Sequence, residues 1–282
     1  MNPVTQQDVL AHQAVVPWPS LIQVEQDLLL CLAMVAIFSH APIAQQVAMR
    51  GGTVLHKIHL EPASRYSEDI DLVVIDPRVA EEEIKAGIED ALLEVFGKPQ
   101  QHFWEDLKLA VRNVARPSRV LRFIYDIPSV MAPTRTLRVE VEVNVTERVP
   151  YLAVVHLPFS VPFQDGDRGA NIASLDIHEM LGTKMRALFQ RRKGRDLFDL
   201  FWAFNESKQT ISVPKVIRCF QHYMGQEGTK VGRGEFTAHL AESLGDRNFR
   251  SDMTPLLLSG LVYDVSRAGM FVRDVLLAEL DE

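Results

Sequence analysis

The sequence predicts an α+β protein in which a mixed α/β first half is followed by an α-helical second half. The segment "DIDLVVID" (69–76) has the apolar, β-branched content of a buried strand. The segments "RVLRFIYDI" (119–127) and "TLRVEVEVNV" (136–145) alternate apolar and polar residues, as half-buried strands do. From Ile177 onward the pattern is helical. We therefore expect an α/β domain with N-terminal helices over residues 1–170 and an α-helical domain over residues 171–282.

Helix signals and strand signals alternate along the first half. "PWPSLIQVEQDLLLCLAMVAIF" (17–38) predicts a helix with Ser20 as its cap and the acidic Glu25 and Asp27 early in the helix. "IAQQVAMR" (43–50) fits either a helix or a short strand, and the glycines of "GGTVLHKIHL" (51–60) open another helix. "RVAEEEIKAGIEDALLEVFG" (78–97) predicts an amphipathic helix that ends at its glycine.

Turn and loop signals separate the predicted strands and helices of the later segments. Residues rich in proline and serine separate the two alternating strands, which favours an antiparallel pair. In the helical second half, "GQEGTKVGRGEF" (225–236) is the most loop-like segment. No internal repeat is evident.

Composition and charge narrow the class of protein. The 282 residues are 47% hydrophobic and 24% charged, which is ordinary for a globular protein, and the net charge of −7 argues against a generally basic nucleic-acid coat. Cys31 and Cys219 lie far apart among apolar residues, so we expect reduced, buried cysteines of a cytoplasmic protein. The longest apolar run (28–38) is shorter than the roughly 20 residues that span a bilayer, so no membrane partner is expected.

Closely spaced carboxylates predict a metal site. In a strand, Asp69 and Asp71 share one face, and aspartate is disfavoured in strands. In the second alternating strand Glu140 and Glu142 share a face, and if the strands are neighbours either one completes a three-carboxylate cluster. Oxygen-only ligands suit a hard cation such as Mg²⁺. The alternative is that the acids face water on a half-exposed sheet, and for Glu140 both interpretations stay open.

A pair of glycines precedes these acids. Gly51 and Gly52 stand before Thr53 and a predicted helix. Glycines let a backbone approach phosphate closely, and a helix N-terminus presents free N–H groups and a positive dipole end. Alone the pair is a weak signal, but beside a metal-binding acid pair it outlines a nucleoside triphosphate site.

At this point the sequence resembles a known family. "GGTVLHKIHL…RYSEDIDLVV" is similar to the signature of the DNA polymerase β-type nucleotidyltransferase superfamily, and more narrowly to the AbiEii/AbiGii toxin family of nucleotidyltransferases. That family's Arg-x-Ser-x-Asp-x-Asp pattern is met by Arg65, Ser67 and the aspartate pair, and Glu142 fits its third carboxylate. Arg50 stands where the family usually has lysine.

A second family hallmark is matched in "EMLGTKMRALFQRRKGRDLFDL" (179–200). The matching positions are Lys184, Arg191, Arg195, Asp196 and Asp199. On one continuous helix the three cations fall near one azimuth and form a stripe able to bind phosphate, although a glycine at 194 is expected to end that helix. Other interpretations are a solvated helix end for residues 191–193, an N-cap for Asp196 and a salt bridge to Arg195 for Asp199.

The resemblance implies a polymerase β-like domain with a mixed sheet and an enzyme that moves a nucleoside monophosphate from a nucleoside triphosphate to an acceptor. It implies RNA, at the 3′ end of a tRNA, as acceptor, and a toxin of a bacterial toxin–antitoxin or abortive-infection system with a separately encoded antitoxin. Two Mg²⁺ ions are expected on Asp69, Asp71 and Glu142. The expected nucleotide-binding residues are Gly51, Gly52, Thr53, Arg65, Ser67, Lys184 and Arg191. The expected catalytic residues are Asp69, Asp71, Glu142, Lys184, Asp196 and Asp199.

Two other classes of function stay open. One is a non-catalytic nucleotide-binding or interaction protein, and the other is transfer of the γ-phosphoryl group. A second basic run is formed by Arg112, Arg116, Arg119 and Arg122. It fits an RNA path or a solvated strand edge equally well. His56 and His59, three residues apart, lack a third metal ligand at suitable spacing.

Overall fold

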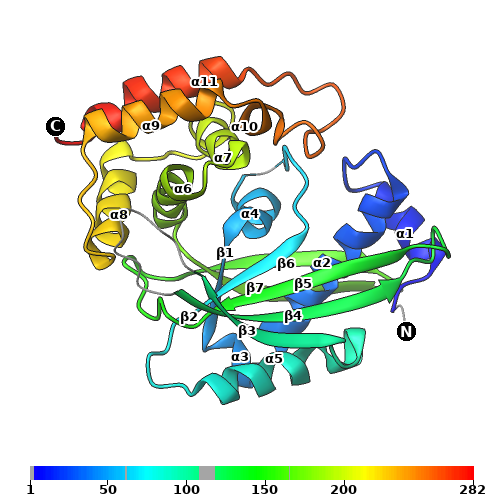
Figure 1. Cartoon of the computed structure of the whole chain (residues 1–282). Helices are drawn as coiled ribbons and strands as arrows, with labels where there is room; N and C mark the ends of the chain where they lie inside the picture. The colour runs from blue at the N-terminus through cyan, green and yellow to red at the C-terminus, as the bar shows by residue number, and fades with distance from the viewer. Residues whose placement is uncertain (1–2, 61, 108–117, 165) are drawn as a thin grey trace. The chain divides into compact units, whose positions relative to one another are not determined.

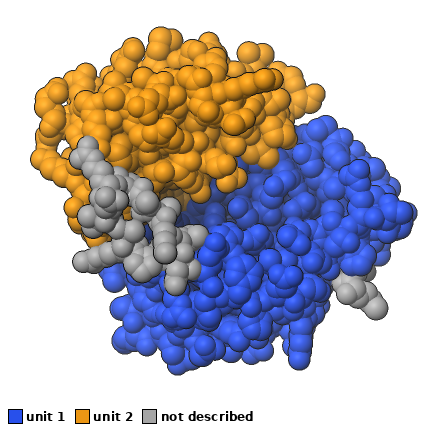
Figure 2. Space-filling model, in the orientation of Figure 1, with its two compact units in different colours: residues 1–58, 65–107, 118–175 blue, residues 59–64, 108–117, 176–282 orange. Residues whose placement is uncertain are grey.

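The computed structural model describes residues 3–60, 62–107, 118–164 and 166–282. The chain divides into two compact units, which Figure 2 colours separately. The first unit comprises residues 1–58, 65–107 and 118–175. The second comprises residues 59–64, 108–117 and 176–282. Arg112 and Arg116 of the second basic run lie outside the described residues.

A seven-stranded mixed sheet is the centre of the first unit (Figure 1), in the order β3-β4-β5-β2-β1-β7-β6. Its strands are β1 (Val47–Arg50), β2 (Asp69–Val74), β3 (Gln101–Leu107), β4 (Ser118–Pro128), β5 (Thr136–Asn144), β6 (Val155–Phe163) and β7 (Gly166–Ser174). The neighbours β2–β5 and β1–β7 are parallel, and the remaining pairs are antiparallel. The predicted β4–β5 hairpin and the mixed sheet are confirmed.

The described part of the first unit also contains helices. They are α1 (Gln6–Gln13), α2 (Leu21–Ser39), α3 (Ala41–Ala44), α4 (Gly51–Val54) with its π-helical continuation Leu55–His59, and α5 (Glu81–Phe96). The helix α2 packs on strands β2, β5, β6 and β7, while α5 packs on α2 and β4. Gly97 ends α5 with a φ of 74°, as the sequence predicts.

Helix α2 is the core helix of the first unit. By length and composition it could cross a membrane, but 72% of its apolar window is buried inside the structure, which is typical of a core helix. Ser20 stands at the N-cap position, but its side chain makes no capping hydrogen bond. Glu25 and Asp27 are fully buried rather than solvated. Each of these two carboxylates therefore needs polar partners from other elements.

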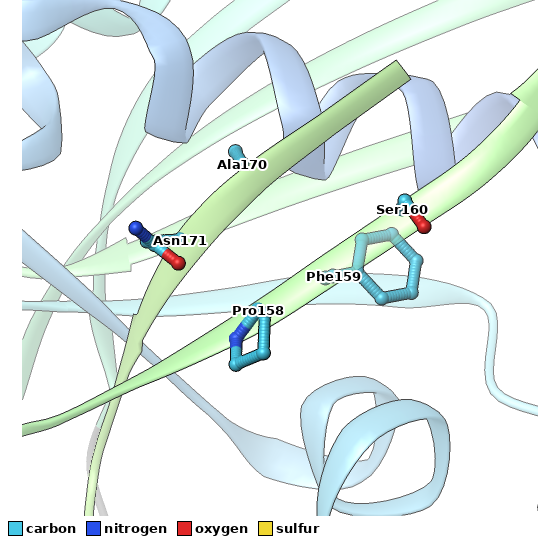
Figure 3. Close-up of a pocket in the computed structure, with 5 residues that line it drawn as sticks. All are labelled: Pro158, Phe159, Ser160, Ala170 and Asn171. Carbon is cyan, nitrogen blue, oxygen red and sulfur yellow. The ribbon is translucent and has the colours of Figure 1, made fainter. Parts of the chain in front are cut away.

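Three strands and one helix are absent from the sequence prediction. Helix α1 begins at the Thr5 cap, where Thr5 and Asp8 form a capping box. Strand β3 lies at one edge of the sheet and β6 at the other. The β6–β7 hairpin forms a cavity of about 350 Å³ (Figure 3). Its lining residues are Pro158, Phe159, Ser160, Ala170 and Asn171. None of them is charged or belongs to the expected site.

The second unit is helical, as the sequence predicts for the second half. Its elements are α6 (Ile177–Arg191), α7 (Gly194–Asn205), α8 (Val213–Gln226), α9 (Arg233–Gly245), α10 (Arg247–Ser251), α11 (Val265–Phe271), a π-helix (Val272–Leu276) and a 3₁₀ turn (Leu277–Glu279). Helix α6 packs on α7 and α8. A side chain at Gly182 would bring its Cβ to 2.5 Å from the Cβ of Cys219, so glycine lets α6 and α8 approach closely. The expected loop at 225–236 is shorter, covering residues 227–232 between α8 and α9.

Candidate functional site

The expected carboxylates lie in one row across two neighbouring strands. Because β2 and β5 are parallel, Asp69 lies opposite Glu140 and Asp71 opposite Glu142. Both aspartates are partly exposed, whereas Ile70 between them is fully buried, so the alternation predicted from the sequence is confirmed. The sequence left open which glutamate joins the aspartates. The register of the strands places both on the acidic face.

Arg122 lies within this row. It occupies the position opposite Glu142 in β4, and its Nη1 contacts the carboxylates of both Glu140 and Glu142. Its Nε donates to Oε2 of Glu105, on β3, at 2.5 Å. Burial lowers the pKa of Arg122, but its carboxylate neighbours raise it more strongly, so the guanidinium stays charged. Arg122 is therefore an ion-paired residue of the sheet and not a solvated strand-edge residue.

One arginine does not neutralise the whole row. Burial raises the pKa of Glu142 and the charge of Asp71 raises it further, so that it reaches about 8 although Arg122 lowers it. Burial and the neighbouring acids together therefore outweigh the effect of Arg122 on this carboxyl group. All of the row's ligand atoms are carboxylate oxygens, the donors that Mg²⁺ prefers. The donor type of Asp69, Asp71 and Glu142 therefore suits a divalent cation. Among the described residues, however, only His12, Asp27 and Cys31 bring three ligand atoms within 4.8 Å of one another, so a cation on the carboxylate row stays a prediction.

The glycine turn lies directly against one end of the row. Gly51 follows β1 with a φ of 82°, a conformation that favours glycine. A Cβ atom at Gly51 would lie 1.9 Å from Oδ2 of Asp71, so no larger residue fits there without displacing that carboxylate. The backbone at the start of α4 therefore reaches the carboxylate of Asp71. Phosphate binding by this turn stays a prediction.

The remaining expected residues of the first motif surround the second glycine. A Cβ atom at Gly52 would lie 2.5 Å from Nη2 of Arg65 and 3.0 Å from Oγ of Ser67. Arg65 is 3% exposed, and its Nη1 donates to the carbonyl oxygen of Tyr66 at 3.0 Å. The Ser67 hydroxyl lies 3.5 Å from Oδ1 of Asp69. The structure thus brings together both glycines, the arginine, the serine and the aspartates.

Thr53 has a structural contact in this structure. Its side chain is fully buried, and its hydroxyl donates to the carbonyl oxygen of Asp69. This hydrogen bond ties α4 to the start of β2. Arg50, at the position where the family usually has lysine, pairs with Glu147 at 2.5 Å. The expected contact of Thr53 with phosphate stays a prediction.

A buried polar cluster supports the helix after the glycines. Lys57, on the π-helical turn, forms an ion pair with Asp27 of α2. The same carboxylate accepts hydrogen bonds from Trp18 at 2.7 Å and contacts Nε2 of His12 at 2.9 Å. His12, Asp27 and Cys31 each place a metal-ligand atom within 4.8 Å of the others. Because Lys57 already supplies a positive charge to Asp27, this set is better explained as a closed ion-pair network than as a metal site.

The second motif forms its own network inside the second unit. Nζ of Lys184 lies 2.8 Å from Oδ2 of Asp199 and 3.3 Å from Oδ1 of Asp196. Arg191 makes a bidentate contact to Asp196 through Nε at 2.8 Å and Nη2 at 2.9 Å. Both aspartates are fully buried. Burial raises the pKa of Asp196, but Arg191 and Lys184 lower it more strongly, so Asp196 is ionised. Two cations of α6 therefore compensate two buried acids of α7.

This geometry corrects two sequence interpretations at the boundary between α6 and α7. Gly194 does not end the first helix: α6 ends at Arg191, Arg192 adopts a left-handed conformation with φ of 50°, and Gly194 begins α7. A Cβ atom at Gly194 would lie 2.2 Å from the carbonyl oxygen of Phe249. Lys193, not Asp196, occupies the N-cap position.

The cationic stripe also does not continue along one helix. Arg195 belongs to α7, while Lys184 and Arg191 belong to α6. The ion pair of Asp199 is with Lys184 of the preceding helix, rather than with Arg195 one turn before it.

Comparison with known proteins agrees with this geometry. A family model described as "Nucleotidyl transferase AbiEii toxin, Type IV TA system" matches residues 32–266. The chain belongs to the AbiEii nucleotidyl transferase toxin family. This AbiEii chain is therefore a nucleotidyltransferase-family enzyme, and the family is the toxin component of a type IV toxin–antitoxin system. No curated protein matches it at a significant level.

A solved structure shows the same fold. MenT4, a nucleotidyltransferase toxin from Mycobacterium tuberculosis H37Rv, is similar with a TM-score of 0.61 and 18% identity, over 99% of this AbiEii chain and 91% of that chain. An antigenic nucleotidyltransferase-like protein from Paracoccidioides brasiliensis matches 70% of this chain and 88% of that chain, at 15% identity and a TM-score of 0.34. The match to MenT4 shows a nucleotidyltransferase-like α+β fold.

Arg122 is the residue of the AbiEii site that sequence reasoning missed. A signal for it exists in the β4–β5 hairpin. The predicted turn between the two strands pairs Pro128 with Thr136, and continuing this register pairs Arg122 with Glu142. Glu105 carried no comparable signal, because β3 was not predicted.

Proposed function

We propose that this enzyme is Mg²⁺-dependent and transfers a nucleoside monophosphate from a nucleoside triphosphate to RNA, at the 3′ end of a tRNA. The observation that carries the proposal is the contact between the glycine turn and the carboxylate row. Gly51 brings a helix N-terminus, which binds phosphate, against Asp71, which belongs to a set of metal-binding oxygens. A metal–triphosphate complex needs both features side by side.

Different residues of the first unit would bind the metal ions, the phosphates and the leaving pyrophosphate. Asp69, Asp71 and Glu142 would hold two Mg²⁺ ions, which supply charge neutralisation to the triphosphate and lower the pKa of an attacking hydroxyl group. The backbone of Gly51 and Gly52 orients the β- and γ-phosphates. Arg65, buried against Gly52, adds positive charge on the side where pyrophosphate leaves.

Further residues have proposed roles in proton transfer and in phosphate binding. Glu142 is suited to accept the proton of the attacking hydroxyl group. Ser67 bonds to a phosphate or shapes the turn before β2. Lys184, Arg191, Asp196 and Asp199 form a charge-balanced network in the second unit. Their roles in the reaction rest on the family resemblance.

The partners follow from the family. The description of the family as a type IV toxin supports a separately encoded antitoxin as partner. The two cysteines are free and buried, which supports a cytoplasmic location.

The direct test is a transfer assay with radiolabelled nucleotides. Purified protein is incubated with bacterial tRNA, Mg²⁺ and each of the four nucleoside triphosphates, labelled on either the α- or the γ-phosphate. We expect label in RNA from one or more α-labelled nucleotides, with wild-type protein but not with Asp71→Asn. Asp76→Asn is the matched control, because Asp76 follows the same strand but pairs with the exposed Arg78.

The other functions predict different labels. Transfer of γ-label without pyrophosphate would show phosphoryl transfer. Mg²⁺-dependent nucleotide binding with no label transferred to RNA or to any component of a cell extract would show a binding protein. Either result overturns the proposal. Label on a different acceptor in the extract would keep nucleotidyl transfer and replace only the tRNA.

A further inference from the structure

A cavity of about 400 Å³ opens beside the carboxylate row in the first unit. This volume is within the range of small-molecule sites, about 300–1,000 Å³. Its lining residues are Ile22, Gln26, Glu68, Asp69, Arg135, Thr136, Leu137, Arg138 and Glu140. Asp69 and Glu140 belong to the row, whereas Asp71 and Glu142 do not line the cavity. The cavity therefore reaches the row at a different carboxylate pair from the one that the glycine turn approaches.

Both positively and negatively charged side chains line the cavity. Arg135 and Arg138 come from the β4–β5 hairpin and β5, and both are exposed. Within the part of the chain that the structure describes, Arg135 makes no ion pair, and Arg138 pairs with Asp126 at 3.1 Å while its side chain remains 60% exposed. Three carboxylates face them, and Ile22 and Leu137 supply apolar surface. A complementary ligand carries an anion at the arginines, hydroxyl groups at the carboxylates and a flat or apolar body between them.

The hairpin that carries the arginines is fixed in place. Glu25, fully buried on α2, accepts hydrogen bonds from the Ser129 hydroxyl at 2.6 Å and from the backbone N–H groups of Val130 and Met131 at 2.7 and 3.2 Å. Gln26 donates to the carbonyl oxygen of Arg138 at 3.0 Å. These hydrogen bonds hold the hairpin at residues 129–131 and the backbone at Arg138 in a defined position without ligand. The backbone that carries the two arginines is therefore preorganised, while their side chains are exposed.

We infer that this cavity binds the terminal nucleotide of the RNA acceptor, with Arg135 and Arg138 on its phosphates. The inference rests on the proposed function and names the place of its second substrate. A 3′-terminal nucleotide has the required pattern, because a phosphodiester lies on one side of the sugar and hydroxyl groups on the other. The planar guanidinium groups of the two arginines can donate paired hydrogen bonds to phosphate oxygens. In this position the hydroxyl group that attacks the nucleoside triphosphate would lie next to Asp69.

The test separates the two substrates kinetically. Arg135→Ala, Arg138→Ala and the double variant are compared with Arg78→Ala, an exposed arginine paired to a nearby aspartate elsewhere in the same unit. We expect the KM for RNA to rise about tenfold in the double variant, with the KM for nucleotide unchanged, and no effect in Arg78→Ala. Arg135→Lys, which keeps the charge, should lose less than Arg135→Ala.

RNA binding measured on a variant that does not catalyse transfer tests the cavity independently of the transfer assay. With Asp71→Asn protein and fluorescent single-stranded RNA, the slope of log affinity against log salt concentration should decrease by about 0.7 for each lost phosphate contact. An unchanged RNA affinity and KM in the double variant overturns the inference. A rise in the KM for nucleotide alone also overturns it and assigns the cavity to the incoming nucleotide. Absence of transfer by wild-type protein, with RNA affinity still dependent on both arginines, contradicts the proposed function and not the cavity.

Discussion

Gly51 and Asp71 are in such close contact that the glycine has no room for a side chain: a Cβ atom would lie 1.9 Å from Oδ2 of the aspartate. Asp71 belongs to β2, and Gly51 begins α4 directly after β1, whose last residue, Arg50, lies opposite Asp71 in the antiparallel neighbouring strand. This contact joins the proposed phosphate-binding turn to the proposed metal-binding row. It is the structural basis of the proposed reaction.

A substitution at Gly51 should therefore affect activity more than folding. Gly51→Ala forces the carboxylate of Asp71 to move and places alanine at a φ of 82°. Gly260→Ala is the matched control, because Gly260 has the same φ and nothing within 4 Å of the added Cβ. Both variants should lose about 1–2 kcal/mol of stability from the left-handed backbone, measured by urea unfolding. Only Gly51→Ala should lose nucleotide transfer. Equal activity in the two variants would contradict the proposed contact.

Sequence reasoning located this part of the site because local patterns determine it. The alternation around Asp69 and Asp71 fixes which residues share a face, and the hairpin turn fixes the partners of β5. The pairing of β2 with β5 depends on residues far apart in sequence. The sequence patterns could therefore state this pairing only as a condition, and the structure shows that β2 and β5 are neighbours.

Arg122 should stabilise the carboxylate row when no metal is bound. Arg122→Gln removes the shared cation from Glu140 and Glu142, whose side chains are 26% and 21% exposed. We expect a loss of about 1–3 kcal/mol in the presence of a chelator, less than for fully buried pairs because water screens part of the charge. Mg²⁺ should restore much of this loss, so Mg²⁺ should raise the Tm of the variant more than that of wild type. An equal shift in Tm would show that the metal does not bind at this row.

The buried pair of Asp27 and Lys57 should make stability depend on pH. Burial raises the pKa of Asp27, but Lys57 and His12 lower it more, to about 2, against 3.8 in the unfolded chain. A lowered carboxyl pKa contributes stability that is complete above about pH 4 and is lost as the pH falls toward 2. The difference corresponds to roughly 2 kcal/mol. Urea unfolding between these pH values should show this slope in wild type and a flatter one in Asp27→Asn.

Salt distinguishes this pair from a surface pair. The pKa of Asp76 is also lowered to about 2, first by its hydrogen bonds to Arg78, but this pair is exposed. Salt screens exposed charges far more than buried ones. The pH dependence that Asp27→Asn removes should therefore persist in high salt. Its disappearance in high salt would contradict a buried pair.

The ion pairs of Lys184 with Asp196 and Asp199 should contribute to the stability of the second unit. Lys184→Met leaves Asp196 and Asp199 buried with one cation fewer, which should cost about 3–5 kcal/mol. Adding Asp199→Asn should restore much of this loss. Nucleotide transfer should stay low in the restored double variant, because the family resemblance assigns Lys184 to the reaction. Recovery of both stability and transfer would show that Lys184 is only structural.

The elements that the sequence did not reveal have weak local signals. Strand β6 contains Pro158 and Pro162, which are tolerated because β6 is an edge strand. Strand β7 contains Gly166 and Gly169 and has low β-propensity, and it is held by pairing with β6 on one side and β1 on the other. Long-range pairing, rather than local preference, makes these segments strands.

The predicted boundary between α6 and α7 was wrong for a related reason. A glycine after a basic helix usually ends it, whereas Gly194 is required by its close approach to the carbonyl oxygen of Phe249, more than 50 residues later. The partners of Asp196 likewise depend on the packing of α6 against α7. Neither relationship leaves a pattern in the local sequence.

The central claim is that the carboxylate row holds the metal ions for nucleotide transfer. Its most direct test is single-turnover transfer from α-labelled nucleotide over a range of Mg²⁺ concentrations, with wild type, Asp71→Asn and the control Asp76→Asn. The account predicts saturable Mg²⁺ dependence for wild type and Asp76→Asn, and no transfer by Asp71→Asn at any Mg²⁺ concentration. Transfer by wild type in excess chelator, or undiminished transfer by Asp71→Asn, would contradict it.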